Sequence, residues 1–412
     1  MTSTSRPGAE PILLAFSGGL DTSFCVPWLK ETYQRPVITV TVDTGGIDAA
    51  AAQSLAERSQ KLGAIEHHLI DARIPYFEQV LKYLLMGNVR RGGVYPLCVG
   101  AERVLQAQTI AQMALSLGTK MVAHGCTAAG NDQVRFEVAL RTLGPDLEII
   151  APVRDRAFKR PEQLKYLEDH RLPIPPFGAA YSVNRGLWGV TIGGKETLTS
   201  DGSIPDDAWV LSKDAFSAPR APQRHVIGFN RGVPVSLDGS ARSAVAIIEE
   251  LEQLAGPFGI GRGIHLGDTV IGTKGRVAFE APAADVLLTA HRELEKLVLT
   301  GKQARIKDAV AQPYGDLVHE GQHLDPVCRD IEALLVSSQA RVSGEVRVLF
   351  RPGSIFVEGV ASPYSLMAAS KGVYGESAGE WTPTDALGYS KMLALTGVFY
   401  HRAGAHAAGA DT

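Results

Sequence analysis

Short apolar runs alternate with longer amphipathic stretches from residue 11 to residue 151, and this alternation restricts the possible folds strongly. The runs are rich in β-branched and aliphatic residues, so they predict strands at residues 12–16, 37–42, 64–70, 120–124 and 147–151. The stretches between them predict helices at residues 22–33, 48–62, 75–85, 101–117 and 132–143. Strands that alternate with helices of this length indicate an α/β fold, with a parallel sheet covered on both faces. Because ligands of such sheets bind outside the carboxyl ends of the strands, we expect the chemistry in the loops that follow the strands.

The pattern changes after the segment Arg171-Leu-Pro-Ile-Pro-Pro-Phe-Gly178, whose three prolines in four residues are incompatible with a helix or a central strand. Beyond it, strand-like runs are predicted at residues 186–192, 225–229, 233–237, 270–271, 277–279, 346–350 and 355–360. Helices are predicted at residues 240–254, 284–299 and 326–338. We therefore predict an α/β domain over residues 1–172, an α+β domain over 178–384 and a C-terminal segment, 385–412, with a helix at 385–407. That helix either folds back or packs on a neighbouring subunit.

Charge and cysteine content exclude several classes of protein. The 412 residues include 41 lysines and arginines against 44 aspartates and glutamates, so no basic excess exists to neutralise a nucleic acid backbone. No apolar run approaches the roughly 20 residues that cross a bilayer, and the first ten residues lack the layout of a secretory signal. The four cysteines are scattered without a Cys-x-x-Cys pair, which argues against a zinc cluster or a disulfide framework. We expect a soluble, cytoplasmic enzyme that binds neither nucleic acid nor membrane.

Two adjacent glycines and three hydroxyl side chains follow the first predicted strand, in the heptapeptide Ser17-Gly-Gly-Leu-Asp-Thr-Ser23, and a helix comes next. Adjacent glycines let the backbone adopt positive φ and approach a ligand closely. The hydroxyl groups and the unpaired amides of the first helical turn then point into one concavity at the positive end of the helix dipole, which favours a phosphate group. The loop is neither a Walker loop nor a dinucleotide fingerprint, because Gly-Lys-Ser/Thr and Gly-x-Gly-x-x-Gly are both absent.

Asp21 is the unusual member of this loop, because a carboxylate beside phosphate groups is unfavourable unless a cation lies between them. We expect it to hold a Mg²⁺ ion that bridges to pyrophosphate oxygens. The alternative is an ordinary strand-to-helix turn, in which serine, glycine and aspartate occur for capping reasons alone. The position of the whole heptapeptide, at the carboxyl end of the first strand and before a helix, favours the phosphate site.

A second cluster of polar residues follows the fourth predicted strand. Thr127, Asn131, Asp132 and Arg135 offer a hydroxyl, an amide, a carboxylate and a guanidinium group, and the spacing of Asn131 and Arg135 places them on one helix face. This assortment suits a zwitterion, with Asp132 for its ammonium group and Arg135 or the helix amides for a carboxylate. The alternative is a capped helix, with Asn131 at the N-cap and Arg135 in solvent. The zwitterion site is favoured because both loops lie at the same sheet edge.

These motifs resemble those of a known family. The heptapeptide is similar to the pyrophosphate loop of the N-type ATP pyrophosphatases, which cleave ATP between its α- and β-phosphates, and its Asp-Thr-Ser ending resembles the argininosuccinate synthase family. The segment Ala123-His-Gly-Cys-Thr-Ala-Ala-Gly-Asn-Asp-Gln-Val-Arg-Phe136 is similar to that family's aspartate and citrulline segment. The resemblance continues through Ile150-Ala-Pro-Val-Arg154 and Lys274-Gly-Arg-Val-Ala-Phe-Glu-Ala-Pro282. It covers most of the chain and implies a nucleotide-binding domain followed by a synthetase domain.

The resemblance also implies roles for individual residues. It places the ATP contacts at Ala15, Phe16, Ser17, Gly18, Gly19, Leu20, Asp21, Thr22, Ser23, Val42 and Gly125. It places the aspartate contacts at Thr127, Asn131 and Asp132, and the citrulline contacts at Tyr95, Asn131, Arg135, Ser182 and Thr191. Asp21 and Ser17 are the implied catalytic residues, with Mg²⁺ on Asp21, although packing explains a lone tyrosine such as Tyr95 equally well.

The resemblance is weakest in the acceptor pocket. Gly267 stands where the family pattern has a glutamate, Phe279 where it has a tyrosine and Gly100 where it has a serine. Ala129 replaces a lysine in the aspartate and citrulline segment. A lost partner of a buried polar group costs about 1–3 kcal/mol unless another group or water replaces it. Asp268 is the candidate replacement.

Together these observations predict an AMP-forming carbon–nitrogen ligase, and the resemblance implies that it joins aspartate to citrulline through a citrullyl-AMP intermediate in arginine biosynthesis. The resemblance also implies a homotetramer. Three alternatives stay open: a paralogue with another ureido or carbamoyl acceptor, an RNA-modifying ATP pyrophosphatase and a metabolite sensor without turnover. The net charge of −3 and the lack of a cysteine pair speak against the RNA-modifying enzyme, and an intact Asp21 speaks against the sensor.

Overall fold

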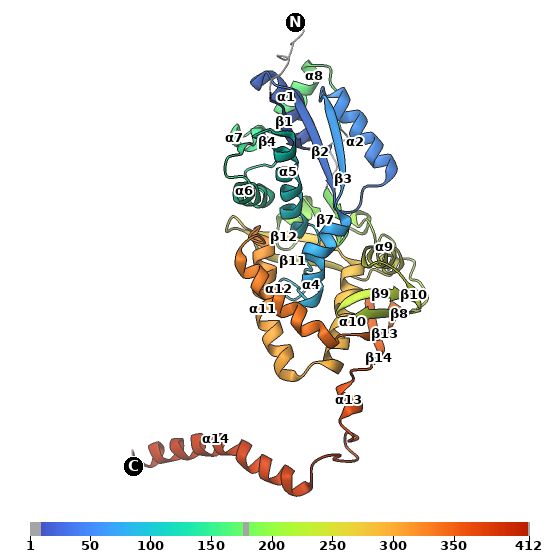
Figure 1. Ribbon diagram of the computed structural model, residues 1–412, viewed down its shortest axis with the longest axis vertical. Helices are drawn as coiled ribbons and strands as arrows, with labels where there is room; N and C mark the ends of the chain where they lie inside the picture. The colour runs from blue at the N-terminus through green and yellow to red at the C-terminus, as the bar shows by residue number, and fades with distance from the viewer. Residues whose placement is uncertain (1–9, 176–180, 411–412) are drawn as a thin grey trace. The chain divides into compact units, whose positions relative to one another are not determined.

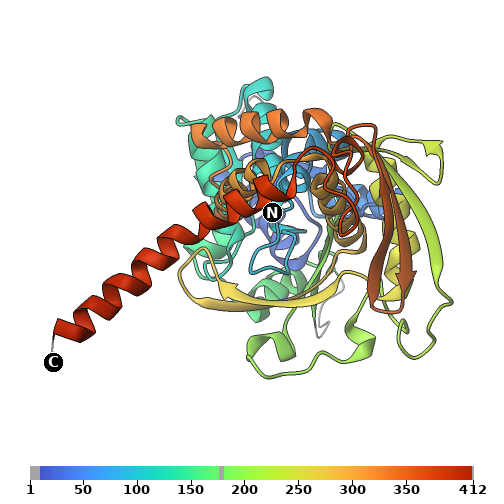
Figure 2. The same cartoon turned by 90° about the horizontal axis from the view of Figure 1, so that it is seen from below.

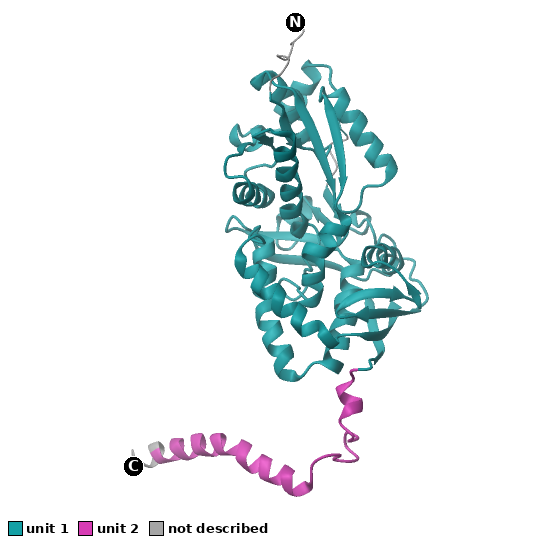
Figure 3. Ribbon diagram, in the orientation of Figure 1, with its two compact units in different colours: residues 1–363 teal, residues 364–412 magenta. Residues whose placement is uncertain are grey.

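The computed structural model describes residues 10–175 and 181–410 of the 412-residue chain. The chain divides into two compact units, Met1–Pro363 and Tyr364–Thr412 (Figure 3). Part of the proline-rich segment that was predicted as a boundary, residues 176–178, lies outside the described residues. Among the described residues, no helix combines the length and the apolar character that a membrane crossing requires.

A five-stranded sheet forms the first part of the larger unit, in the order β3-β2-β1-β4-β5, and all its neighbouring strands are parallel (Figure 1). Its strands are β1 (Ile12–Ala15), β2 (Val37–Asp43), β3 (Glu66–Asp71), β4 (Met121–Ala123) and β5 (Glu148–Ile150). The predicted parallel α/β fold is confirmed.

Helices cover both faces of this sheet. The sheet is contacted by α1 (Leu20–Tyr33), α2 (Ala49–Lys61) and α5 (Arg103–Leu117). The other helices of this part of the chain are α3 (Arg73–Tyr76), the π-helical turn η1 (Phe77–Leu81), α4 (Lys82–Met86), α6 (Asp132–Leu143), α7 (Pro152–Asp155) and α8 (Arg160–Asp169), of which α4 packs against helices of the later part. Leu13 packs in one core cluster with Val104 of α5, whereas its neighbours Ile12 and Leu14 pack in another with Phe24 of α1. Because successive side chains of a strand point to opposite faces, a strand buried on both sides has the continuous apolar run seen in the sequence.

The strand order reverses between β1 and β4. The chain runs outward from β1 through β2 to β3, and then returns to the other side of β1 as β4 and β5. The loops after β1 and β4 therefore open side by side at the carboxyl ends of the strands, which is the usual ligand position in such sheets.

The rest of the larger unit contains two antiparallel sheets, in the orders β10-β9-β8-β13-β14 and β11-β12-β7-β6. Their strands are β6 (Ser182–Gly186), β7 (Gly189–Gly193), β8 (Gln223–Asn230), β9 (Val233–Leu237), β10 (Ser240–Ala241), β11 (Arg262–Asp268), β12 (Lys274–Glu280), β13 (Gly344–Arg351) and β14 (Ser354–Ala361). The accompanying helices are α9 (Ala244–Ala255), α10 (Pro282–Val298), α11 (Gly301–Glu320) and α12 (Pro326–Ser338). Helices α9 and α10 pack against the first of these sheets (Figure 2). The predicted α+β character is confirmed.

Some local predictions in this part were wrong. The strand predicted at 186–192 corresponds to β7 but begins too early, because residues 186–189 form the turn between β6 and β7, with φ of +133° at Gly189. The strand predicted at 270–271 is the turn between β11 and β12. The helix predicted at 240–254 begins only at Ala244, because the preceding β10 pairs with β9. Helix α11 was not predicted, since Pro313 interrupts its sequence pattern.

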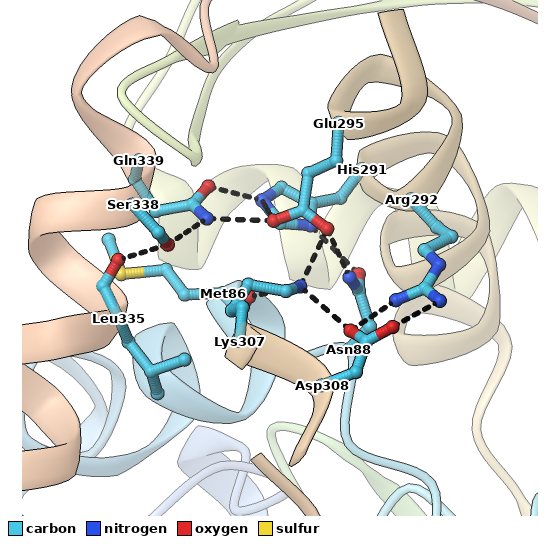
Figure 4. Close-up of polar contacts among 10 residues, drawn as sticks. All are labelled: Met86, Asn88, His291, Arg292, Glu295, Lys307, Asp308, Leu335, Ser338 and Gln339. Atoms are coloured by element: carbon cyan, nitrogen blue, oxygen red, sulfur yellow. Dashed lines mark hydrogen bonds and ion pairs between the residues drawn. The ribbon is translucent and has the colours of Figure 1, made fainter. Parts of the chain in front are cut away.

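A buried polar network ties α10 and α11 to the end of α12 (Figure 4). Lys307 Nζ donates hydrogen bonds to Glu295 Oε2 at 2.6 Å and to the Met86 carbonyl at 3.0 Å. Glu295 also accepts hydrogen bonds from Asn88 Nδ2 at 2.6 Å and from Gln339 Nε2 at 2.7 Å. Lys307 is 1% exposed and Glu295 is 3% exposed. Such a deep ion pair is tolerated only where hydrogen bonds satisfy both charged groups, as they do here.

The smaller unit consists of α13 (Leu366–Ala369), a connecting segment and α14 (Pro383–Ala410). Helix α14 begins where Thr382 N and Oγ1 donate to Asp385 Oδ2 at 2.9 and 2.6 Å. Its large apolar side chains, among them Leu387, Met392 and Phe399, are exposed. The predicted C-terminal helix is confirmed.

Candidate active site

The loop between β1 and α1 requires glycine at position 18. Gly18 has φ of +72°, and a Cβ there would lie 2.3 Å from Leu55 Cδ2. Arg58 Nη1 of α2 donates to the Gly18 carbonyl at 2.6 Å, and Ser17 Oγ lies 3.2 Å from Thr22 Oγ1. Helix α1 has no side-chain cap. The amides of its first turn therefore remain available to an anion.

Asp21 lies in the first turn of α1, where Gln163 Nε2 of α8 donates to its Oδ1 at 2.9 Å. Gln163 is buried, so this bond fixes the orientation of the carboxylate. Among the described residues, no group of three or more histidine, cysteine, aspartate or glutamate side chains could hold a metal ion. A Mg²⁺ ion at Asp21 would complete its coordination largely with phosphate oxygens and water, as Mg²⁺ commonly does.

The loop after β4 lies directly against the loop after β1. A Cβ at Gly125 would lie 2.9 Å from Thr22 Cγ2, so the two loops touch where Gly125 leaves space. Strand β1 ends at Ala15 and Phe16 follows it, while Val42 lies near the carboxyl end of the adjacent β2. The residues implied for ATP are therefore brought together at the reversal of strand order.

Asp132 is held between two arginines at the start of α6. Arg103 Nε donates to its Oδ2 at 2.9 Å, and Arg135 Nη1 donates to its Oδ1 at 2.8 Å. Burial alone would raise the pKa of Asp132, but the two guanidinium groups outweigh this effect and hold the pKa at about 2. Asp132 is therefore charged at neutral pH, and its side chain is still 39% exposed.

The alternative of a simply capped helix is wrong for α6. Asn131 precedes the helix, but its side chain makes no cap hydrogen bond; instead its Oδ1 accepts from Val270 N at 2.9 Å. Arg135 is buried rather than solvated, and its Nε donates to the His319 carbonyl at 2.7 Å. Both residues thus join the parallel-sheet part of the unit to the later part, through the β11–β12 turn and α11.

A cavity of about 220 Å³ opens between these two parts. Its lining includes Tyr95, Asn131, Asp132, Arg135 and Thr191 of the predicted site. Gly100 and Gly267, two positions of departure from the family pattern, also line it. A Cβ at Gly100 would lie 3.0 Å from Arg135 Nη2, so the glycine gives the guanidinium group room.

Other predicted residues are not part of this lining. Ser182 is exposed at the start of β6, whereas Asn184 of the same strand lines the cavity beside Thr191. Thr127 lies in the loop after β4, where its carbonyl accepts from Gly130 N at 3.4 Å. Phe279 is buried behind Tyr95, at 5.1 Å between ring centroids.

Glu102 is a buried carboxylate directly beside the cavity. It ends the 3₁₀ turn η2 (Gly100–Glu102) and is 2% exposed. Thr44 Oγ1 donates to its Oε2 at 2.7 Å, and Arg103 Nη1 donates to its Oε1 at 2.5 Å. Burial raises the pKa of Glu102 to about 7, despite the guanidinium group of Arg103. The cavity therefore adjoins a group that changes charge near neutral pH.

Comparison with known proteins now decides the family. The arginosuccinate synthase N-terminal HUP domain matches residues 11–173, and the arginosuccinate synthase C-terminal domain matches residues 181–400. Argininosuccinate synthase from Pyrobaculum aerophilum is 40% identical over 393 residues, covering 94% of this chain and 97% of the relative. The chain belongs to the argininosuccinate synthase family.

Similarity to the argininosuccinate synthase family extends across distant organisms. The enzyme from Xanthomonas campestris pv. campestris is 40% identical over 399 residues, which cover 95% of this chain and 98% of the relative. The enzyme from Methanocaldococcus jannaschii is 37% identical over 354 residues, which cover 86% of this chain and 89% of the relative. The resemblance that the two loop motifs indicated is therefore confirmed along nearly the full chain.

Several residues at this argininosuccinate synthase-like site escaped the sequence analysis. They are Arg58, Glu102, Arg103, Gln163, His265 and His319. Each reaches the site from an element that carries no recognisable motif. Only Glu102-Arg103 offered a local signal, since adjacent charged residues are unusual in an otherwise apolar stretch.

Proposed function

We propose that this chain catalyses the ATP-dependent ligation of L-aspartate to L-citrulline, which gives argininosuccinate, AMP and pyrophosphate in arginine biosynthesis. Relatives that match nearly the whole chain carry the name argininosuccinate synthase. The proposal rests above all on the contact between the loops after β1 and β4, with the cavity opening at Asn131 and Asp132.

The reaction has to activate a poor electrophile. Two nitrogens donate electrons into the ureido carbon, and its oxygen is a poor leaving group. Attack of that oxygen on the α-phosphorus of ATP forms citrullyl-AMP and breaks the bond to the bridging oxygen, which leaves with pyrophosphate. The aspartate nitrogen then adds to the activated carbon and loses a proton, and AMP leaves with the former ureido oxygen. The protein therefore acts by positioning and charge stabilisation.

The loop after β1 would bind the outer phosphates of ATP. Ser17 and Thr22 present hydroxyl groups beside the free amides of α1, and Gly18 allows a close approach of the backbone. Asp21 would hold Mg²⁺, which neutralises the charge that develops on the departing pyrophosphate. The remaining ATP contacts in this proposal are Ala15, Phe16, Gly19, Leu20, Ser23, Val42 and Gly125.

The loop after β4 would bind aspartate, through Thr127, Asn131 and Asp132. Arg103 and Arg135 orient the charged carboxylate of Asp132, and its exposed part can accept a hydrogen bond from an ammonium group. The acceptor contacts in this proposal are Tyr95, Asn131, Arg135, Ser182 and Thr191. Of these, Ser182 lies outside the lining of the cavity and would have to approach the substrate from the exposed end of β6.

We also propose a cytoplasmic homotetramer, with a nucleotide-binding domain at 1–172, a synthetase domain at 178–384 and a C-terminal arm at 385–412. The exposed apolar side chains of α14, such as Leu393 and Phe399, support packing of this helix on another subunit. Light scattering on the full chain tests the assembly: four times the chain mass of 44.0 kDa is expected, and a monomer would contradict it.

The function is tested by measuring pyrophosphate release and the nucleotide product while each substrate is omitted in turn. We expect equal amounts of AMP and pyrophosphate only when ATP, aspartate and citrulline are all present. ADP as the product, or turnover that does not need aspartate, would refute the proposal.

A further inference from the structure

One wall of the cavity of about 220 Å³, which we call the acceptor cavity, is strand β11, and the inner face of this strand carries almost no side chains. Because side chains alternate along a strand, residues 263, 265 and 267 share its inner face. Two of them are glycines, so His265 is the single side chain on this face. The outward residues Ile264 and Leu266 are exposed.

The ring of His265 occupies space that a side chain at position 267 would need. A Cβ at Gly267 would lie 2.5 Å from His265 Nε2, and one at Gly92 would lie 2.9 Å from its Cε1. The imidazole stacks on Tyr95 at 5.5 Å between ring centroids, with 16° between the planes. Tyr95 in turn packs on Phe279. The two glycines and the aromatic stack together fix the position of the ring.

Two carboxylates of the described residues line the cavity, and neither lies on the inner face of β11. They are Asp132, held by Arg103 and Arg135, and Asp268, paired with Lys274 at 2.5 Å. Burial and the nearby Arg91 lower the pKa of His265, so its ring is neutral at neutral pH. The inner face of β11 therefore offers a neutral imidazole and no carboxylate.

We infer that His265 is a specificity-determining residue of the acceptor site. Its ring occupies the space of a side chain at 267 and contacts the end of the acceptor that bears the carboxylate and, in citrulline, the α-ammonium group. A neutral imidazole can hydrogen bond a carboxylate or an amine but does not select an ammonium group, as a free carboxylate would. The site therefore accepts ureido carboxylates without an α-ammonium group nearly as well as citrulline. This inference rests on the proposed function and specifies its substrate class.

The test compares citrulline with 5-ureidopentanoate, which is citrulline without its α-amino group. Pyrophosphate release at saturating ATP and aspartate gives kcat/KM for both acceptors in the wild type, His265→Ala and the double variant His265→Ala/Gly267→Glu. Removing the imidazole makes room for the new carboxylate. His68→Ala, whose ring lies on the edge strand β3 away from the cavity lining, is the matched control.

We expect the ratio of kcat/KM for citrulline to kcat/KM for 5-ureidopentanoate to be at least tenfold higher in the double variant than in the wild type. A hydrogen bond to a charged group changes binding by roughly 10- to 100-fold. A smaller change would overturn the inference. If the double variant does not fold, His265→Ala decides: KM should rise about tenfold for both acceptors, with KM for ATP and aspartate unchanged. Unchanged acceptor KM values would overturn it. Absence of pyrophosphate release from the wild type with any acceptor would instead refute the proposed function.

Discussion

Replacement of Glu102 by glutamine should change how stability depends on pH. The pKa of Glu102 is raised from 4.5 to about 7, so the folded protein retains this proton at pH values where the unfolded chain has lost it. Stability is therefore lost as the pH rises from 4.5 towards 7. At about 1.4 kcal/mol for each pH unit, the loss amounts to about 3 kcal/mol. Thr44 and Arg103 donate hydrogen bonds to the Glu102 carboxylate. The neighbouring Asp132 has a lowered pKa and Tyr76 a raised one, so neither titrates between pH 4.5 and 7.

Glutamine resembles the protonated acid and cannot ionise, so Glu102→Gln should remove this loss. Urea unfolding at pH 5, 6, 7 and 8 measures the effect as the difference in unfolding free energy between variant and wild type. We expect that difference to move in favour of the variant by about 2.5 kcal/mol from pH 5 to pH 8, since part of the loss has already occurred at pH 5. Glu57→Gln, at an exposed surface pair with Lys61, should leave the pH dependence unchanged. A difference for Glu102→Gln that does not vary with pH would refute the reasoning.

Two further substitutions test the phosphate site and the buried network. Asp21→Asn keeps an oxygen for the hydrogen bond from Gln163 but removes the charge, so AMP formation should be abolished while thermal unfolding stays unchanged; full activity would exclude the proposed role. Lys307→Met leaves Glu295 buried without its cation and should lower the unfolding free energy by about 3–5 kcal/mol, whereas the exposed Lys61→Met should change it by less than about 1 kcal/mol. Equal effects of the two lysine substitutions would contradict the importance of burial.

The sequence predicts the parallel sheet and its two loops because their signals are local. The apolar run of β1, the glycines at 18 and 19 and the helix that follows lie within one short segment. The same segment specifies its own conformation, since the positive φ of Gly18 and the uncapped start of α1 depend on neighbouring residues. Local patterns were sufficient there.

Contacts between distant segments could not be predicted in this way. Arg135 is buried because its guanidinium group bonds to His319, which lies 184 residues away in the sequence. Asn131 similarly bonds the turn after β11 instead of capping its own helix. The role of Gly267 becomes visible only when the ring of His265 is found beside it. In each case the sequence shows the residue type, whereas the partner depends on how the two parts of the larger unit pack.

The central claim is that the glycine-containing loop after β1 grips the outer phosphates of ATP beside the loop that presents aspartate. A crystal structure with a non-hydrolysable ATP analogue and aspartate tests it most directly. We predict the β- and γ-phosphates within hydrogen-bond distance of the first-turn amides of α1 and the hydroxyl groups of Ser17 and Thr22, with aspartate at Asp132. A triphosphate bound elsewhere, with this loop unoccupied, would contradict the account.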